Sequence, residues 1–350
     1  MRSFPVNSYV YALWGMFLLL FFSCEKENGD GIVDWPANFE EVTADYVGPD
    51  QVFVTADIAG TFADIGEMGF CWATTSPPTV DDNKLSHTPI PGIYTHTIEG
   101  LESGTTYFAR AYYLFEDTAF YSTTLTFTTT TPVEDNDGNA YKVIQIGNRL
   151  WMGENLRVSS YNNDDPISDG TGTGNYSGME DPKFFFHYDD DPDNDDDYGK
   201  LYTWHVITDN RGICPAQWRV PDIADWEQLI GHLDALSEDY LSPDEGSLEL
   251  SAIAGGMLRQ TGTLEDQTGL WHSPNTGASN ITGMNLVPSG LRDPSGSFDG
   301  MGYNAAFWSF TEETSNSAIM MYTHYFNPGI YANHFVKSSG YAVRCVRNAP

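Results

Sequence analysis

The chain of 350 residues carries 49 Asp and Glu against 16 Lys and Arg, a formal net charge of −33. A nucleic-acid backbone and an anionic membrane surface both repel such a chain, and no five-residue window holds more than two basic residues. Hydrophobic residues make up 41% and aromatic residues 14%, which excludes a largely disordered protein and allows about two domains. Gly, Tyr and Phe are plentiful and charged residues are only 19%, so we expect a β-rich protein.

The N-terminus has the pattern of an export signal. Arg2 precedes an apolar stretch, Val10 to Phe22, that is shorter than the ~20 residues of a membrane-spanning helix. Residues 1–23 are therefore predicted to be a signal peptide, with an N-terminal anchor or a buried helix as the alternative. Cys24 follows the small residue Ser23, an arrangement that resembles the bacterial lipobox. The resemblance implies that Cys24 is lipidated and becomes the first residue of a membrane-anchored chain.

A polar, acidic segment follows the cysteine. Residues 24–36 cannot bury apolar surface, so we expect them to form an acidic tether. An acidic stretch directly after a lipidated cysteine resembles the export signal of Bacteroidetes surface lipoproteins. The resemblance implies an outer-membrane protein that is lipid-anchored and exposed at the cell surface.

Residues 37–130 are predicted to form an all-β sandwich. Short alternating runs separated by turn residues, at spacings of about 8–12 residues, are typical of sandwiches. The runs are 52–56, 69–72, 94–98, 107–113 and 124–128. The stretch from Gly100 to Ala111 resembles the fibronectin type III signature, and the resemblance implies that Leu101 and Tyr107 pack a corner between two strands. We expect a spacer rather than an independent binding module, because no His, Asp and Ser constellation is present.

Residues 132–350 are the second predicted domain. Tyr141–Gly147 alternates as a strand, and Ile223–Ile230 has helical spacing behind Asp222, a suitable N-cap. Further motifs follow in order: Tyr198–Trp204, Ile213–Pro221, Phe307–Glu312 and Gly340–Arg347. Together they resemble the Fibrobacter succinogenes major paralogous domain, a family of Bacteroidetes and Fibrobacter surface lipoproteins.

The same motifs resemble a wider group, the C-type-lectin-like fold of formylglycine-generating enzymes. The resemblance rests on Trp218–Pro221, the helix after it, Trp308–Ser309 and Val343–Cys345. It implies an α+β domain whose chain ends meet in one small sheet, with a long irregular region that residues 240–305 fit. Those enzymes bind copper through two cysteines near the last strand. Only Cys345 lies there in this chain, so the resemblance does not extend to their activity.

The remaining cysteines suggest one free thiol and one cross-link. Cys71 has no second cysteine in its segment and is expected to be buried and free. Cys214 and Cys345 lie in one domain of an exported protein, and we predict a disulfide between them. It would join the segment before the helix to the final strand, as the long-range disulfide of C-type-lectin-like domains does. Two buried thiols are the alternative.

Acidic residues crowd one stretch of the second domain. Residues 161–197 hold twelve acids and one base, Lys183. Within this stretch carboxylates stand at every second position: Asp191, Asp193, Asp195 and Asp197. Oxygen ligands so spaced are typical of Ca²⁺-binding loops, so these four are a weak calcium candidate. A solvated, mutually repelling loop is the alternative, and we expect no other cofactor.

Aromatic residues supply another candidate site, because aromatic faces can pack against sugar rings. The candidates are Phe184, Phe185, Phe186, His187, Tyr188, Trp271, His272, Tyr303, Tyr322, Tyr325, Phe326 and Tyr331. We expect most of them to be core or strand-pairing residues and a minority to face a ligand. His324 and His334 lie on two predicted strands of one hairpin, and a metal site between them is an alternative to plain packing.

The sequence lacks a nucleophile elbow, a zinc-protease helix and a phosphate-binding loop, so we predict that the protein is not an enzyme. We predict a non-catalytic surface lipoprotein. Its C-terminal domain would bind a glycan or another extracellular ligand, displayed on the sandwich. One alternative is a structural or adhesive cell-envelope protein that binds other proteins. The other is an enzyme on a C-type-lectin-like scaffold.

Overall fold

A computed structural model of the chain describes residues 37–60, 62, 64–240 and 247–350. The chain divides into two units, Met1–Trp35 and Pro36–Pro350. The predicted signal peptide, the lipidated Cys24 and the tether 24–36 lie outside the described residues. Within the described part, every helix is too short or too polar to cross a bilayer.

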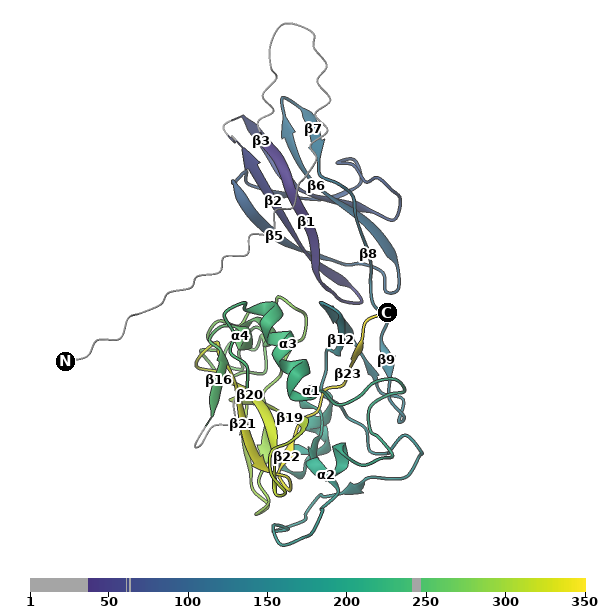
Figure 1. Ribbon diagram of the computed structural model, residues 1–350, viewed down its shortest axis with the longest axis vertical. Helices are drawn as coiled ribbons and strands as arrows, with labels where there is room; N and C mark the ends of the chain where they lie inside the picture. Colours follow the sequence, from purple (N-terminus) through teal and green to yellow (C-terminus); the bar gives the residue numbers. More distant parts are fainter. Residues whose placement is uncertain (1–36, 61, 63, 241–246) are drawn as a thin grey trace, which may run out of the picture. The chain divides into compact units, whose positions relative to one another are not determined.

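Two antiparallel sheets form the N-terminal part of the described chain (Figure 1). The first contains β1 (Ala37–Val47), β2 (Gln51–Gly60) and β5 (Gly92–Glu99). The second contains β3 (Ile65–Ala73), β4 (Asn83–His87), β6 (Thr106–Phe115), β7 (Thr118–Tyr121) and β8 (Leu125–Thr128). Alternate side chains of both sheets meet in one apolar cluster, which confirms the predicted sandwich-like arrangement. The five predicted runs coincide with parts of β2, β3, β5, β6 and β8, respectively, and the last run begins one residue before β8.

The corner between β5 and β6 is fixed by the two residues that the signature singled out. Leu101 and Tyr107 are both buried in the sandwich core. The backbone N–H of Glu102 donates to the Tyr107 hydroxyl at 3.0 Å, and that of Leu101 donates to the Asp50 carbonyl at 3.0 Å. Leu101 and Glu102 lie in the connection between the two strands, where strand pairing leaves their N–H groups without partners, and these hydrogen bonds supply the partners.

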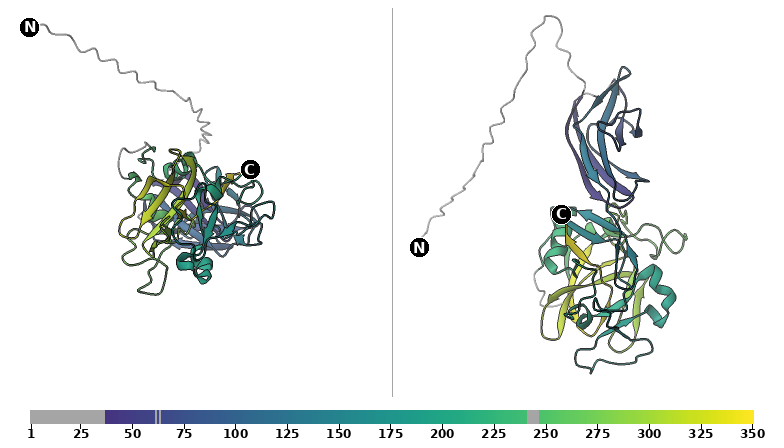
Figure 2. Two further views of the ribbon diagram at one scale, coloured as in Figure 1. Left: turned by 90° about the horizontal axis from the view of Figure 1, so that it is seen from below. Right: turned by 90° about the vertical axis from the view of Figure 1, so that its right-hand side faces the viewer.

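The first sheet continues beyond the sandwich. β1 pairs with β11 (Val143–Ile146), β11 pairs with β12 (Arg149–Met152), and β12 pairs with β23 (Val346–Asn348), all antiparallel. β12 and β23 lie side by side near the C-terminus in Figure 1 and in the right-hand view of Figure 2. The two ends of segment 132–350 therefore meet in one sheet, as the resemblance implied, and the same sheet joins that segment to the sandwich.

Two larger sheets and one small one build the rest of the molecule. A six-stranded sheet has the order β13 (Ser168–Asp169), β14 (Phe184–Phe186), β15 (Leu201–Thr203), β22 (Gly340–Tyr341), β17 (Ser289–Arg292), β18 (Phe298–Met301). A four-stranded sheet has the order β16 (Leu248–Ser251), β21 (Ile330–Val336), β20 (Ser317–His324), β19 (Asn304–Glu312). β9 (Val133–Glu134) and β10 (Ala140–Tyr141) pair separately. Apart from β13 on β14, the strand pairs are antiparallel in the described residues.

Helices are few and short. They are η1 (Tyr188–Asp190), η2 (Pro192–Asn194), α1 (Asp195–Tyr198), α2 (Trp204–Ile207), α3 (Ile223–Leu233) and α4 (Ala254–Leu258). α3 begins where the sequence predicts, because Asp222 accepts a hydrogen bond from the Asp225 N–H at 3.0 Å in a reciprocal capping box. Its buried residues recur every three or four positions, so one face of α3 packs against the core.

Asp225 anchors α3 to two arginines. Its carboxylate is 1% exposed and accepts from Arg149 Nε at 3.1 Å and from Arg219 Nη2 at 2.7 Å. Burial by itself raises the pKa of Asp225, but the hydrogen bonds from Arg219 and from the backbone of Asp222 outweigh it, so the pKa lies below its ordinary value. The cap of α3 is thereby tied to β12.

β19 divides the core of segment 132–350 into two clusters. Successive residues of a strand point to opposite faces, so Phe307 packs with Trp151 and Trp226, while Trp308 packs on the other side with Tyr341. Trp151, Trp226 and Trp308 are fully buried.

Three arginines are buried among the irregular segments: Arg259, Arg292 and Arg344. No ion pair joins any of them to a described carboxylate. Arg259 donates to the carbonyls of Asn327 and Thr276, and Arg292 lies 4.1 Å from the ring of Phe186. Burial lowers the pKa of Arg344 to about 9 and that of Arg259 to about 10, because each cation loses its hydration. These guanidinium groups hold loops together through backbone carbonyls.

Candidate functional site

Seven aromatic side chains lie in one continuous row along one end of the four-stranded sheet. Each ring centroid lies 4.2–5.6 Å from the next. We call this set the aromatic row; in order it consists of His272, Tyr303, Tyr325, Phe326, His324, Tyr322 and Tyr331. These separations are those of interacting aromatic pairs, so each ring is held in place by its neighbours.

Strand geometry and turns bring the row together. Tyr322 and His324 are two residues apart on β20 and therefore share one face. Tyr331 lies directly opposite Tyr322 on β21. Tyr325 and Phe326 occupy the turn between those strands. The remaining two members come from the turn before β19 and from the loop after residue 270.

The row contains three stacked ring pairs. His272 stacks on Tyr303 at 4.2 Å, His324 on Phe326 at 5.0 Å and Tyr322 on Tyr331 at 5.3 Å, with interplanar angles of 24°, 20° and 22°. In the first two pairs one ring is open to solvent: Tyr303 is 42% exposed and Phe326 53%. Their partner rings, His272 and His324, are more buried. Each exposed ring therefore stacks on a ring that the surrounding structure holds in place.

Polar groups line the edges of the row. Glu265 pairs with His272 Nδ1 at 2.8 Å and accepts from the Ser273 N–H at 2.8 Å, and these hydrogen bonds lower the pKa of Glu265. At the other end, Tyr331 interacts with the side chains of Glu249 and Asn327. Burial lowers the pKa of His324, so this ring is neutral at neutral pH. The His324 ring is thus uncharged, and hydrogen-bonding groups lie beside both ends of the row.

The sequence named six of these seven residues but also several that lie elsewhere. Trp271 is fully buried and its Nε1 donates to the Leu286 carbonyl at 3.0 Å, so it cannot face a ligand. Phe185 and Phe186 are core residues of β14, and Tyr188 is buried too. For His324 the sequence suggests a metal site or plain cross-strand packing, and neither of these interpretations includes a sugar-stacking role. Its two-residue spacing from Tyr322, which puts both side chains on one face of β20, is the sequence signal that could have identified it.

The two histidines of the hairpin do not form a pair. His334 lies opposite Ile319 on β20, whereas His324 stands at the far end of the same strand, opposite Asn304 of β19. Within the described residues, no three His, Cys, Asp or Glu side chains come together as metal ligands.

The four aspartates of the calcium candidate are spread over short helical turns. Asp191 precedes η2 and its side chain accepts from the Asp193 N–H at 3.1 Å, while Asp195 pairs with His187 Nδ1 at 2.8 Å. Asp193 and Asp197 are exposed. Helical backbone rotates alternate residues away from one another, so side chains two apart diverge instead of sharing one ion. The geometry gives the calcium prediction no support.

The predicted disulfide is confirmed. Cys214 and Cys345 are bonded, with Cα atoms 5.8 Å apart. Both are buried in the core cluster that contains Trp308 and Tyr341, which we call the Trp308 cluster. Cys214 precedes α3 and Cys345 precedes β23, so the bond joins the segment before the helix to the final strand.

Cys71 is free and fully buried, as predicted, and burial raises the pKa of its thiol to about 11. The thiolate is the reactive form, so we expect no reaction with a thiol reagent in the folded state at neutral pH. A Cys24→Ala chain should show no reactive thiol when folded and one per chain in denaturant without reductant. Three thiols in denaturant would contradict the disulfide.

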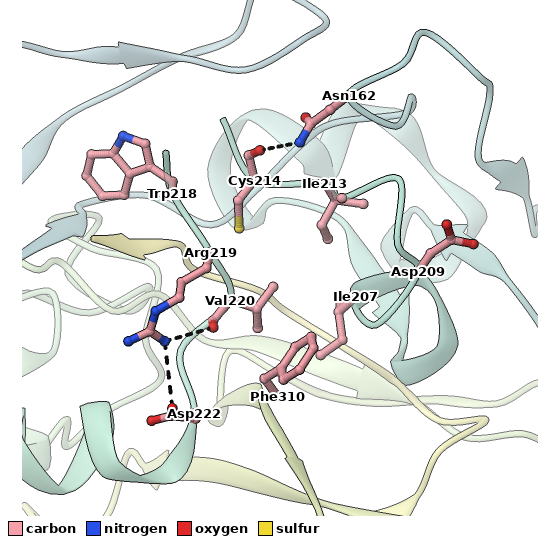
Figure 3. A pocket seen from close by; sticks show the side chains of 11 residues that line it. Asn162, Ile207, Asp209, Ile213, Cys214, Trp218, Arg219, Val220, Asp222 and Phe310 are labelled. Atoms are coloured by element: carbon pink, nitrogen blue, oxygen red, sulfur yellow. Dashed lines mark hydrogen bonds and ion pairs between the residues drawn. The ribbon is translucent and has the colours of Figure 1, made fainter. Parts of the chain in front are cut away.

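A pocket of about 390 Å³ lies beside Cys214, within the usual size range of ligand pockets (Figure 3). Its apolar wall is made by Ile207, Ile213, Val220 and Phe310. Figure 3 shows the Phe310 ring directed toward Ile207 and Val220, although the side chain is 48% exposed. The pocket could receive a small apolar group.

The charged groups around this pocket already have partners. Asp209 accepts from Arg211 at 2.8 Å and from Lys183 at 2.7 Å, which lowers its pKa. Arg219 donates to Asp225. The third charged group, Asp222, is the N-cap of α3 and accepts from the Asp225 N–H. The pocket therefore has no free charged group for a ligand, and the aromatic row is the stronger candidate site.

Comparison with known proteins identifies one family. No curated protein matches the chain. Among solved structures, the sensor domain of the anti-sigma factor RsgI4 of Pseudobacteroides cellulosolvens matches at 19% identity, over 28% of this chain and 98% of that chain. Its TM-score of 0.22 is too low to bear on the fold. The family model of the Fibrobacter succinogenes major domain matches residues 144–347, more than half of the chain, and the protein therefore belongs to the Fibrobacter succinogenes major domain family.

Proposed function

We propose that the protein is a non-catalytic, lipid-anchored surface protein whose C-terminal domain binds a glycan on the aromatic row. One observation carries the proposal: three stacked ring pairs in one row, with Tyr303 and Phe326 about half exposed. Aromatic rings offer large rigid faces at a low cost in conformational entropy, and the CH faces of sugars pack on them.

The edges of the row favour a sugar over a purely apolar ligand. Tyrosine hydroxyls and the side chains of Glu249, Glu265, Asn304 and Asn327 lie next to the rings. A sugar presents hydroxyl groups around an apolar face, so it can stack and hydrogen-bond at once. Sites of this kind combine apolar surface with a few placed polar groups.

The proposal includes the domain types and the location. The buried Tyr107, whose hydroxyl bonds the backbone five residues upstream, supports a fibronectin type III-like spacer. The meeting of β12 with β23 and the Cys214–Cys345 bond support a C-type-lectin-like domain. The lipobox-like Cys24 and the acids after it support an anchor at the Bacteroidetes outer-membrane surface.

Removing the two exposed rings tests the site. Tyr303→Ala with Phe326→Ala should weaken glycan binding by about 5- to 150-fold, since each aromatic contact is worth about 0.5–1.5 kcal/mol. Binding of the purified chain to a glycan array, followed by calorimetry on the glycans retained, measures this. Loss of stability should be small, because both rings are already about half exposed.

Two substitutions serve as matched controls. The first is Phe335→Ala: Phe335 lies on β21 and is 42% exposed, but its ring contacts Tyr341, which is not part of the row. Phe310→Ala opens the pocket beside Cys214 instead. Both variants should bind glycan normally. If no glycan is retained, or if Phe310→Ala and not the row variant abolishes binding, the proposed site is wrong.

A further inference from the structure

We infer that the aromatic row binds an extended, uncharged polysaccharide, which excludes glycans rich in uronate or sulfate. The inference rests on the proposed function and names the class of its ligand. It depends on a separate observation, the distribution of charge around the row.

Exposed positive charge is missing from the part of the chain that builds the row. From Pro221 to Val336 the sequence contains no lysine and two arginines, Arg259 and Arg292, against fifteen acids. Both arginines are 0–1% exposed, so neither can reach a ligand at the surface. An acidic glycan is recognised through arginine or lysine side chains, and this segment offers none.

Acids stand at both ends of the row. Glu265 pairs with His272 at the first ring, and its side chain is 51% exposed. Glu249 lies opposite Tyr331 at the last ring and interacts with its hydroxyl. Two unit charges 4 Å apart repel by about 1 kcal/mol even in bulk water, so a carboxylated chain laid along the row meets repulsion at each end.

The faces between those acids carry no charge. His324 is neutral because it is partly buried, and the other inner rings are tyrosine and phenylalanine. Each flanking acid already holds a ring of the row, Glu265 through His272 and Glu249 through Tyr331. Uncharged aromatic faces with occupied acids at their edges fit a neutral ligand better than a cationic one.

The number of rings indicates a ligand of several sugar units. A single sugar ring stacks on one aromatic ring, whereas the row presents two half-exposed rings, Tyr303 and Phe326, that belong to different stacked pairs. Binding should therefore strengthen as an oligosaccharide is lengthened, and a monosaccharide should compete poorly.

A matched charge series tests the inference on the full chain. The probes are xyloglucan, galactomannan, a β-glucan and an α-glucan, each beside its oxidised form in which primary hydroxyls have become carboxylates; chitosan is the cationic probe. Affinity electrophoresis should show at least one neutral polymer bound, with the same affinity at ~0.01 M and ~1 M salt. Its oxidised form should bind about tenfold more weakly at ~0.01 M salt, a gap that closes as salt screens the repulsion.

Charge variants sharpen the result. Glu249→Gln with Glu265→Gln keeps an acceptor oxygen beside each ring but removes both charges. It should raise binding of the oxidised form relative to that of the neutral polymer, so that the tenfold gap between the two at ~0.01 M salt disappears. Equal or tighter binding of an oxidised polymer by the native chain overturns the inference, as does binding of chitosan alone that is lost at high salt. If no polymer binds the native chain, or if the double variant Tyr303→Ala with Phe326→Ala binds every polymer as tightly as the native chain does, the proposed function is overturned instead.

Discussion

Replacing Cys214 and Cys345 together by alanine is expected to lower the free energy of unfolding by about 5 kcal/mol. The bond closes a loop with a sequence separation of 131, and the loss of loop-closure entropy in the unfolded chain gives about this value. Both sulfurs are also buried in the Trp308 cluster, so the folded state loses packing as well. Denaturant unfolding followed by tryptophan fluorescence measures the change.

Two comparisons isolate the bond from the packing. Adding reductant should lower the stability of the native chain by a similar amount and leave the double variant unchanged. Cys71→Ala removes an equally buried sulfur that forms no cross-link, and we expect it to cost about 1 kcal/mol. If reductant leaves the stability of the native chain unchanged, the bond does not stabilise the fold.

Arg344→Met should lower the free energy of unfolding by about 4 kcal/mol. Arg344 is fully buried and donates to the Met152 carbonyl at 3.1 Å, the Asn285 carbonyl at 3.0 Å and Asn155 Oδ1 at 2.8 Å, and also to the Met284 carbonyl. Each acceptor left unpaired costs roughly 1–3 kcal/mol, and the relief from burying a cation offsets only part of that.

Arg347 provides the matched control for Arg344. It lies three residues further on and is partly exposed, and its guanidinium carbon lies 5.2 Å from the centroid of the Trp218 ring. Arg347→Met should cost less than about 1 kcal/mol. Arg344→Lys should recover only part of the loss, because one ammonium cannot span acceptors on several segments. If Arg344→Met is as stable as the native chain, the prediction is wrong, and the carbonyls of Met152, Met284 and Asn285 must find other hydrogen-bond donors.

Local patterns predicted the features that depend on neighbours in the chain. Alternation placed β2, β3, β5, β6 and β8, and the capping residue Asp222 placed the start of α3. The pairing of Cys214 with Cys345 was predicted because both cysteines lie in one domain of a chain with an export signal, and the C-type-lectin-like resemblance agreed with it. In each case the deciding information is either within a few residues or in the order of motifs.

The features that sequence reasoning missed depend on contacts between distant segments. Arg344 and Asn155 are 189 residues apart, and nothing near either residue signals their hydrogen bond. Trp271 and Tyr303 are both aromatic residues in loops, yet the first is buried and the second 42% exposed, which only the folded chain decides. The aspartates from Asp191 to Asp197 are a local exception: their spacing is typical of ligands, but the short helical turns between them direct alternate side chains apart.

The pairing of β1 with β11 has a mechanical consequence. If the chain is held at its N-terminal end and a ligand pulls on the aromatic row, the load reaches β1 first. It then crosses the backbone hydrogen bonds around Tyr46 and Ile146 to reach the second segment. The bond from the Thr130 N–H to the Gly48 carbonyl holds the end of the first segment beside β1. The junction between the two segments would thus bear tension as part of a sheet, where a bare linker would simply extend.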